Sequence, residues 1–67
     1  MKVTLKSARV NAALTQSQAA KQLEISVDTL RNWENMATFP NAKQIAKIEL
    51  VYGVNYNDII FLPKNYA

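Results

Sequence analysis

Residues 14–35 read LTQSQAAKQLEISVDTLRNWEN, and the local signals in this segment define the domain. Thr15 and Gln18 form the Thr-x-x-Gln pattern of a capping box, which predicts that a helix begins here. Ser26 can cap a second helix that runs to the end of the segment. About three residues separate the two helices, so the chain must turn sharply between them. These proportions are those of a helix-turn-helix unit at about residues 16–35.

Further helices are expected on both sides of this segment, because start and stop signals bound them. The first covers residues of about 3–12. Asn41, with Gln44 three residues later, begins the fourth helix, and Gly53 ends it. The start and stop residues of a short fifth helix are Asn55, Asp58 and Pro63. The predicted fold is therefore all-α, a single compact five-helix domain over residues 1–67.

The composition excludes several classes of protein. The 67 residues hold 8 Lys and Arg against 5 Asp and Glu, a formal net charge of +3, with no Cys and no His. Disulfides and zinc sites built on Cys or His are excluded, and the commonest general base is missing, so we expect neither an enzyme nor a metal or other cofactor. No apolar run approaches the roughly 20 residues that cross a bilayer, and no signal peptide is visible, which favours a cytoplasmic protein without a membrane segment.

The helix that follows Ser26 is expected to carry a polar outer face. Leu30 points to the core, and the residues of the opposite face are Val27, Asp28, Arg31, Asn32 and Asn35. A short face rich in directional hydrogen-bonding groups is what a helix needs to read base edges in a major groove. An ordinary solvated helix face explains the same spacing equally well.

A wider pattern of residues points to a family. It consists of Leu14-Thr15-Gln16, Ala20, Leu23, Ile25-Ser26, Leu30, Trp33-Glu34-Asn35, Pro40, Ile45, Gly53-Val54 and Ile59-Ile60. This pattern resembles the lambda-repressor/Cro-like helix-turn-helix family, the regulators of xenobiotic-response-element type. The resemblance spans about residues 5–61, and LTQ followed by WEN at this spacing is a specific signal. It implies a compact five-helix domain that binds double-stranded operator DNA, usually as a dimer on a two-fold site.

Matched by position, this resemblance assigns contacts with DNA. Val27, Asp28 and Asn32 fall at base-reading positions, where they suit a thymine methyl, a cytosine amino group and an adenine respectively. A first-turn role in the helix dipole explains Asp28 nearly as well. Phosphate contacts are expected from Gln16, from Ser26 unless capping occupies its hydroxyl, and from the flanking Arg31 and Asn35. Arg9 and Glu34 match an ion pair that joins the first helix to the end of the third in this family; two unrelated surface charges are the alternative.

The sequence also departs from the family pattern. Glu24 stands where the family often has Gly in the turn, so a left-handed residue there would be strained. Met36 replaces the usual Gly after Trp-Glu-Asn, and residues 37–39 lack the basic side chains common there. Glu49 takes a position that is usually Ala, and Leu50 takes one that is usually polar. The loss of phosphate contacts weakens the case for tight DNA binding, since counterion release is a large part of that affinity.

The leading hypothesis is a sequence-specific transcriptional regulator, a Cro- or repressor-like switch protein of a phage or mobile element. The alternative is a protein-binding modulator on the same fold, an antirepressor or co-repressor that docks onto another repressor. A lone recognition helix covers only a few base pairs, so we expect a weak, DNA-assisted homodimer. The apolar candidates for that contact, or for a partner protein, are Tyr56, Ile60, Phe61, Leu62 and Leu50.

Overall fold

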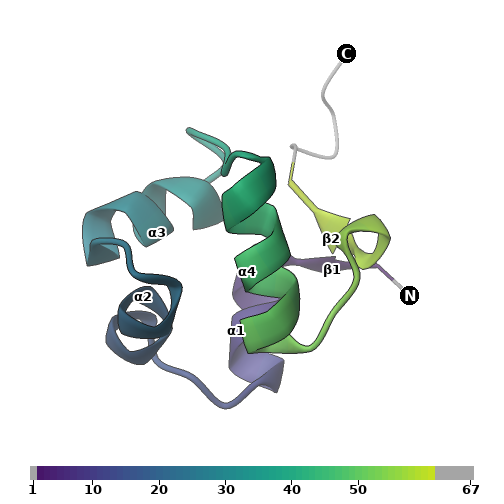
Figure 1. The fold of residues 1–67 in the computed structure, drawn as a ribbon, viewed down its shortest axis with the longest axis horizontal. Helices are drawn as coiled ribbons and strands as arrows, with labels where there is room; N and C mark the ends of the chain where they lie inside the picture. The colour runs from purple at the N-terminus through teal and green to yellow at the C-terminus, as the bar shows by residue number, and fades with distance from the viewer. Residues whose placement is uncertain (1, 62–67) are drawn as a thin grey trace.

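Four α-helices and one pair of short strands form the part of the chain that the structure, a computed structural model, describes: residues 2–61 (Figure 1). The helices are α1 (Leu5–Asn11), α2 (Gln16–Leu23), α3 (Val27–Glu34) and α4 (Ala42–Tyr52). The strands are β1 (Val3–Thr4) and β2 (Ile59–Ile60). In Figure 1, α1 and α4 run through the middle of the molecule, with α2 and α3 on one side and the strands on the other.

The prediction of five helices is wrong. In place of the fifth helix the chain forms one 3-10 turn, η1 (Tyr56–Asp58), followed directly by β2. The side chain of Asn55 makes no capping hydrogen bond, so the expected start signal is not used. Ile59 is already extended, with φ −107° and ψ 133°, and it ends the turn. Pro63, the expected stop signal, lies outside the described residues.

Strand pairing across the two ends of the domain explains this difference. Val3 lies opposite Ile59 and Thr4 opposite Ile60 in a parallel register. All four residues are β-branched, and such side chains favour extended backbone. The first helix therefore begins at Leu5, later than expected, and Thr4 Oγ1 caps it by accepting a backbone N–H of its first turn at 3.0 Å.

The starts of the next three helices are confirmed. Thr15 and Gln18 form a reciprocal capping box at α2, and Asn41 and Gln44 form another at α4. Ser26 Oγ accepts a backbone N–H from the first turn of α3 at 3.1 Å. Each cap bonds a backbone donor that the helix leaves without an internal partner, which is why these short polar signals set helix starts.

Every α-helix contributes to one hydrophobic core. Its buried residues are Leu5, Ala8, Ala19, Ala20, Leu23, Leu30, Trp33, Ile48, Tyr52 and Ile59. Leu30 of α3 and Ile48 of α4 are fully enclosed. The alanines of α2 have short side chains, which let this helix approach its neighbours closely. The helix-turn-helix pair is thus packed firmly onto α1 and α4. None of the helices within residues 2–61 has the length and apolar character needed to cross a bilayer.

Candidate nucleic-acid interface

The turn between α2 and α3 passes through a left-handed residue, Glu24, with φ 60° and ψ 42°. Its backbone N–H donates to the carbonyl of Lys21 at 3.2 Å, and the next N–H, of Ile25, donates to the carbonyl of Ala20 at 3.0 Å. These two bonds close α2 in a Schellman motif, which normally prefers Gly at the left-handed position. Lys47 of α4 donates to the Glu24 carboxylate, and this hydrogen bond holds the pKa of Glu24 below its usual value. The geometry turns the chain sharply into α3.

The outer face of α3 carries the residues expected to meet DNA. Asp28, Arg31, Asn32 and Asn35 are exposed, whereas Val27 is half-buried and packs against the core. Arg31 Nη1 donates to Asp28 Oδ1 at 3.2 Å, so these two side chains lie together. Among residues 2–61, no group hydrogen-bonds with the side chains of Asn32 or Asn35. Both amides are therefore available to a ligand.

A buried ion pair ties α1 to the C-terminal end of α3. Arg9 Nε donates to Glu34 Oε2 at 2.7 Å, and Arg9 Nη2 donates to Glu34 Oε1 at 3.3 Å. Arg9 Nη1 also donates to the carbonyl of Leu14 at 2.9 Å. The two side chains are only 9% and 4% exposed. Removing one partner of such a pair leaves an uncompensated buried charge, which typically costs about 3–5 kcal/mol. The pair thus fixes the orientation of α3 on the scaffold.

Gln16, expected to contact phosphate, also binds this ion pair. Its Nε2 donates to Glu34 Oε1 at 3.1 Å, which ties the first residue of α2 to the end of α3. Within residues 2–61 the other amide hydrogen of Gln16 has no partner, and α2 leaves backbone N–H groups of its first turn without internal bonds. Ser26 is more fully occupied, because its hydroxyl caps α3 and also bonds Thr29 Oγ1 at 2.9 Å. Its contribution to a phosphate contact is correspondingly reduced.

Tyr52 of α4 lies close to the same ion pair and was not anticipated as a special residue. Its side chain is buried, and its hydroxyl has no hydrogen-bond partner among residues 2–61. Burial and the nearby Glu34 carboxylate raise the pKa of Tyr52 to about 12, with Arg9 acting in the opposite direction. In the sequence this tyrosine is merely an apolar position of α4.

Two departures from the family pattern acquire a structural explanation. Glu49 Oε2 accepts the backbone N–H of Tyr56 at 2.8 Å and thereby fixes the start of η1. Met36 adopts the left-handed conformation that Gly usually supplies, with φ 62°. Leu50, by contrast, is 84% exposed on α4, and nothing among residues 2–61 explains an apolar side chain there. The loop after Met36 presents Phe39, which is 53% exposed, in place of cations.

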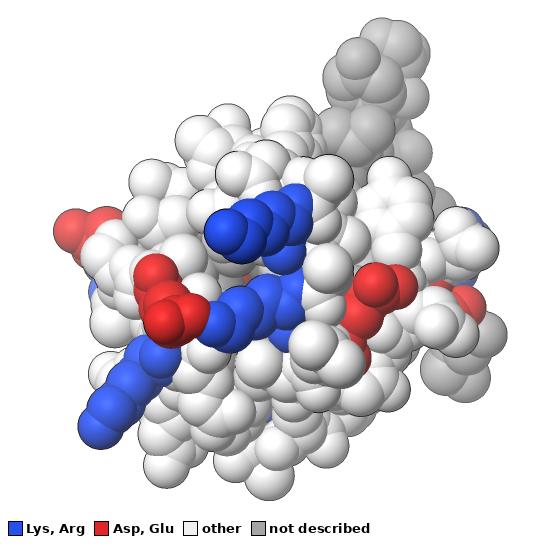
Figure 2. Space-filling view, viewed as in Figure 1, with Lys and Arg blue, Asp and Glu red and all other residues white. Residues whose placement is uncertain are grey.

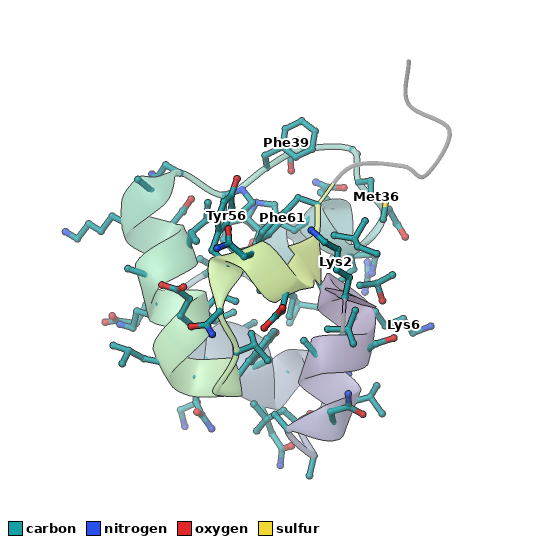
Figure 3. All side chains as sticks on the ribbon, turned by 90° about the vertical axis from the view of Figure 1, so that its right-hand side faces the viewer. Lys2, Lys6, Met36, Phe39, Tyr56 and Phe61 are labelled. Atoms are coloured by element: carbon teal, nitrogen blue, oxygen red, sulfur yellow. The ribbon has the colours of Figure 1, made fainter. Side chains whose placement is uncertain are left out.

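An apolar groove of about 580 Å³ lies beside the strand pair. Its lining residues are Lys2, Phe39, Pro40, Ile45, Tyr56, Ile59, Ile60 and Phe61. The rings of Tyr56 and Phe61 stack with their centroids 5.6 Å apart, and Figure 3 shows them close to Phe39. The structure thus brings together three of the residues expected at a dimer or partner contact, namely Tyr56, Ile60 and Phe61. Leu50 is not among the lining residues, and Leu62 lies outside the described residues.

Charge is distributed unevenly over the surface. On the face seen in Figure 2, Lys and Arg atoms lie beside Asp and Glu atoms, with wide uncharged areas between them. Lys47 is paired with Glu24, and Arg31 is paired with Asp28. The face drawn in Figure 2, on which both charge signs are mixed, does not offer one continuous basic surface to an anionic partner.

A helix-turn-helix domain consists of two short helices joined by a tight turn, and α2 and α3 are joined in this way. The second of them, α3, exposes a polar face and is anchored by a buried ion pair. A family model described as helix-turn-helix matches residues 5–59, which is most of the chain. The chain belongs to this Cro-type, lambda-repressor-like helix-turn-helix family, whose members are DNA-binding regulators of transcription and not typically enzymes. Neither a curated protein nor a solved structure gives a significant match to the chain.

Proposed function

We propose that this protein is a sequence-specific transcriptional regulator that reads operator DNA in the major groove with α3. The observation that carries the proposal is the exposed polar face of α3, held in place by the buried pair of Arg9 and Glu34. A recognition helix must be rigidly placed, because its base contacts are directional hydrogen bonds. Its proposed role is that of a Cro- or repressor-like switch of a phage or mobile element, acting in the cytoplasm.

The proposed contacts divide into base reading and phosphate binding. Asn32 pairs bidentately with an adenine, the carboxylate of Asp28 accepts from a cytosine amino group, and Val27 packs on a thymine methyl. Gln16 meets a phosphate through its free amide hydrogen and the N-terminus of α2. Asn35 meets a phosphate at the flank of α3, with a smaller contribution from Ser26.

Selection of duplexes from a random pool, followed by titration of two matched variants, tests this function. Asn32→Ala should cost about 1–3 kcal/mol on the preferred site and relax the base preference at one position. Asn35→Ala is the control, because it removes the same side chain from the same helix and should weaken all sequences to a similar extent. An unchanged selected motif and affinity for Asn32→Ala would contradict the proposed reading face.

A protein-binding role remains the second candidate, and one observation favours it. The groove beside β2 is apolar, and the neutral loop presents Phe39 where the family pattern has cations. An antirepressor or co-repressor would dock onto another repressor with this surface. A salt series separates the two functions, since the affinity of a regulator for duplex DNA falls steeply with salt, whereas a modulator shows almost no affinity even at low salt.

A further inference from the structure

We propose that Arg31 reads a guanine in the operator and that Asp28 positions it, so that each half-site contains a specified G·C pair. This inference rests on the proposed DNA-reading role of α3 and changes the expectation for Arg31, which was a phosphate contact at the flank of the face. It adds a fourth base-reading side chain to Val27, Asp28 and Asn32.

The position of the guanidinium carries the inference. Arg31 belongs to the last turn of α3, whereas a recognition helix contacts base edges mainly with its N-terminal residues. Arg31 Nη1 donates to Asp28 Oδ1 at 3.2 Å, an i, i+3 bond that draws the guanidinium back toward the first turn. The pair stays accessible, since the side chains of Arg31 and Asp28 are 55% and 86% exposed.

The donors that remain match a guanine. A guanidinium has five N–H donors, and Asp28 engages one of them in the structure. Guanine presents O6 and N7 side by side in the major groove, and two parallel N–H groups of an arginine bind them bidentately. Within residues 2–61 the second oxygen of Asp28, Oδ2, accepts no hydrogen bond, so it can accept from the amino group of a cytosine.

Electrostatics explains why an acidic residue is useful on this face. A lone carboxylate approaching DNA is repelled by the phosphates. The positive charge of Arg31 neutralises the negative charge of Asp28 and so reduces this repulsion. The carboxylate also competes with the phosphates for the guanidinium, so Arg31 is kept over the base edges. An exposed pair of this kind adds little to folding stability, so packing alone gives no reason for the arrangement.

The test begins with selection from a random duplex pool, carried out with the wild-type chain, Arg31→Ala and Asp28→Asn. Each protein is then titrated with the selected duplex and with a copy of it in which each candidate G·C pair is replaced by A·T. Arg31→Ala should weaken binding to the selected duplex roughly 5- to 150-fold and abolish the preference for guanine at one position. Asp28→Asn should reduce that preference while Arg31 is still present, because a neutral amide oxygen holds the guanidinium less strongly than a carboxylate does.

The exposed pair of Lys47 and Glu24 supplies the control, since Lys47→Ala removes a paired cation outside α3 and should leave the selected motif unchanged. If Arg31→Ala keeps the guanine preference, weakens all sequences equally and lowers the salt slope by about one, Arg31 binds phosphate and the inference is overturned. If the wild-type chain selects a motif without guanine, the inference fails while the proposed function stands. If it binds no duplex even at low salt, both fail.

Discussion

The hydroxyl of Tyr52 is a buried polar group that lacks a hydrogen-bond partner among the described residues. It is buried near Glu34 and Arg9, and it has no hydrogen-bond partner among residues 2–61. A buried hydroxyl without a partner typically costs about 1–3 kcal/mol, because it has given up its bonds to water. The rest of the side chain contributes apolar contacts to the core, which phenylalanine would preserve.

We therefore expect Tyr52→Phe to raise the free energy of unfolding by about 1 kcal/mol at about pH 7. The pH dependence has a definite sign. The folded pKa of about 12 lies above the unfolded value of about 10, so the unfolded tyrosine loses its proton first and wild-type stability falls as the pH rises between these values. Relative to Tyr52→Phe, the wild-type chain should lose about 2–3 kcal/mol over this range.

Urea unfolding of both proteins, at about pH 7 and at several pH values between about 10 and 12, measures this difference. All other ionisable groups are the same in the two proteins, so their contributions cancel in the comparison. A difference that does not change with pH would show that the Tyr52 hydroxyl is accessible to water in the folded state.

At the scale of the helices, the unusual feature is how they end. Each α-helix of the described chain is followed by a left-handed residue, yet only Gly53 is a glycine. The others are Ala13, Glu24 and Met36, with φ between 60° and 62°. A side chain in this conformation costs roughly 1–2 kcal/mol, because Cβ crowds the following carbonyl oxygen. The chain accepts this cost at three helix ends, since the sharp turns determine how the helices pack.

Ala13→Gly should therefore stabilise the protein. Relief of strain outweighs the extra backbone entropy of the unfolded glycine, and the expected gain is about 0.5–1 kcal/mol. Ala46→Gly is a matched control, because Ala46 is also exposed but lies inside α4, where the same change should cost about 1 kcal/mol. Thermal and urea unfolding of the two variants give both values. Destabilisation by both substitutions would show that the turn at Ala13 is not strained.

At the scale of the whole molecule, we expect any contact between two copies to involve the groove beside β2. Tyr56, Ile60 and Phe61 line it, and together they form a small apolar surface. An isologous contact limited to so few side chains is far smaller than the interface of a stable dimer. Two copies bound on adjacent half-sites would be held together mainly by DNA, whose half-sites lie about 34–36 Å apart.

We expect the free protein to sediment as a monomer at micromolar concentration and to form a two-to-one complex on a palindromic duplex. Tyr56→Ser should reduce the cooperativity of that complex and leave the affinity for a single half-site unchanged. Sedimentation velocity of free and DNA-bound protein measures both stoichiometries. A one-to-one complex on a palindrome would contradict the dimeric reading and favour the protein-binding role.

Much of the domain follows from local rules. The signals that start and stop the helices involve groups only a few residues apart, so the sequence alone predicts them. They are the capping boxes at Thr15 and Asn41, the cap at Ser26 and the stop at Gly53. The same holds for the inward positions of the helices, which follow the helical period. The helix-turn-helix unit and the outer face of α3 were predicted on this basis.

Other features depend on groups far apart in the chain. The parallel pairing of Val3 with Ile59 replaced the expected fifth helix, because a strand pair becomes favourable only once both ends of the chain meet on a formed core. The Glu34 carboxylate accepts hydrogen bonds from Gln16 as well as from Arg9. The hydroxyl of Tyr52 lies near them without a hydrogen-bond partner among residues 2–61. Local signals therefore determine where most helices begin, and the sequence alone predicts them. The strand pair, the buried polar cluster and the groove beside β2 were decided by the tertiary structure, because the residues that form them are far apart in the sequence.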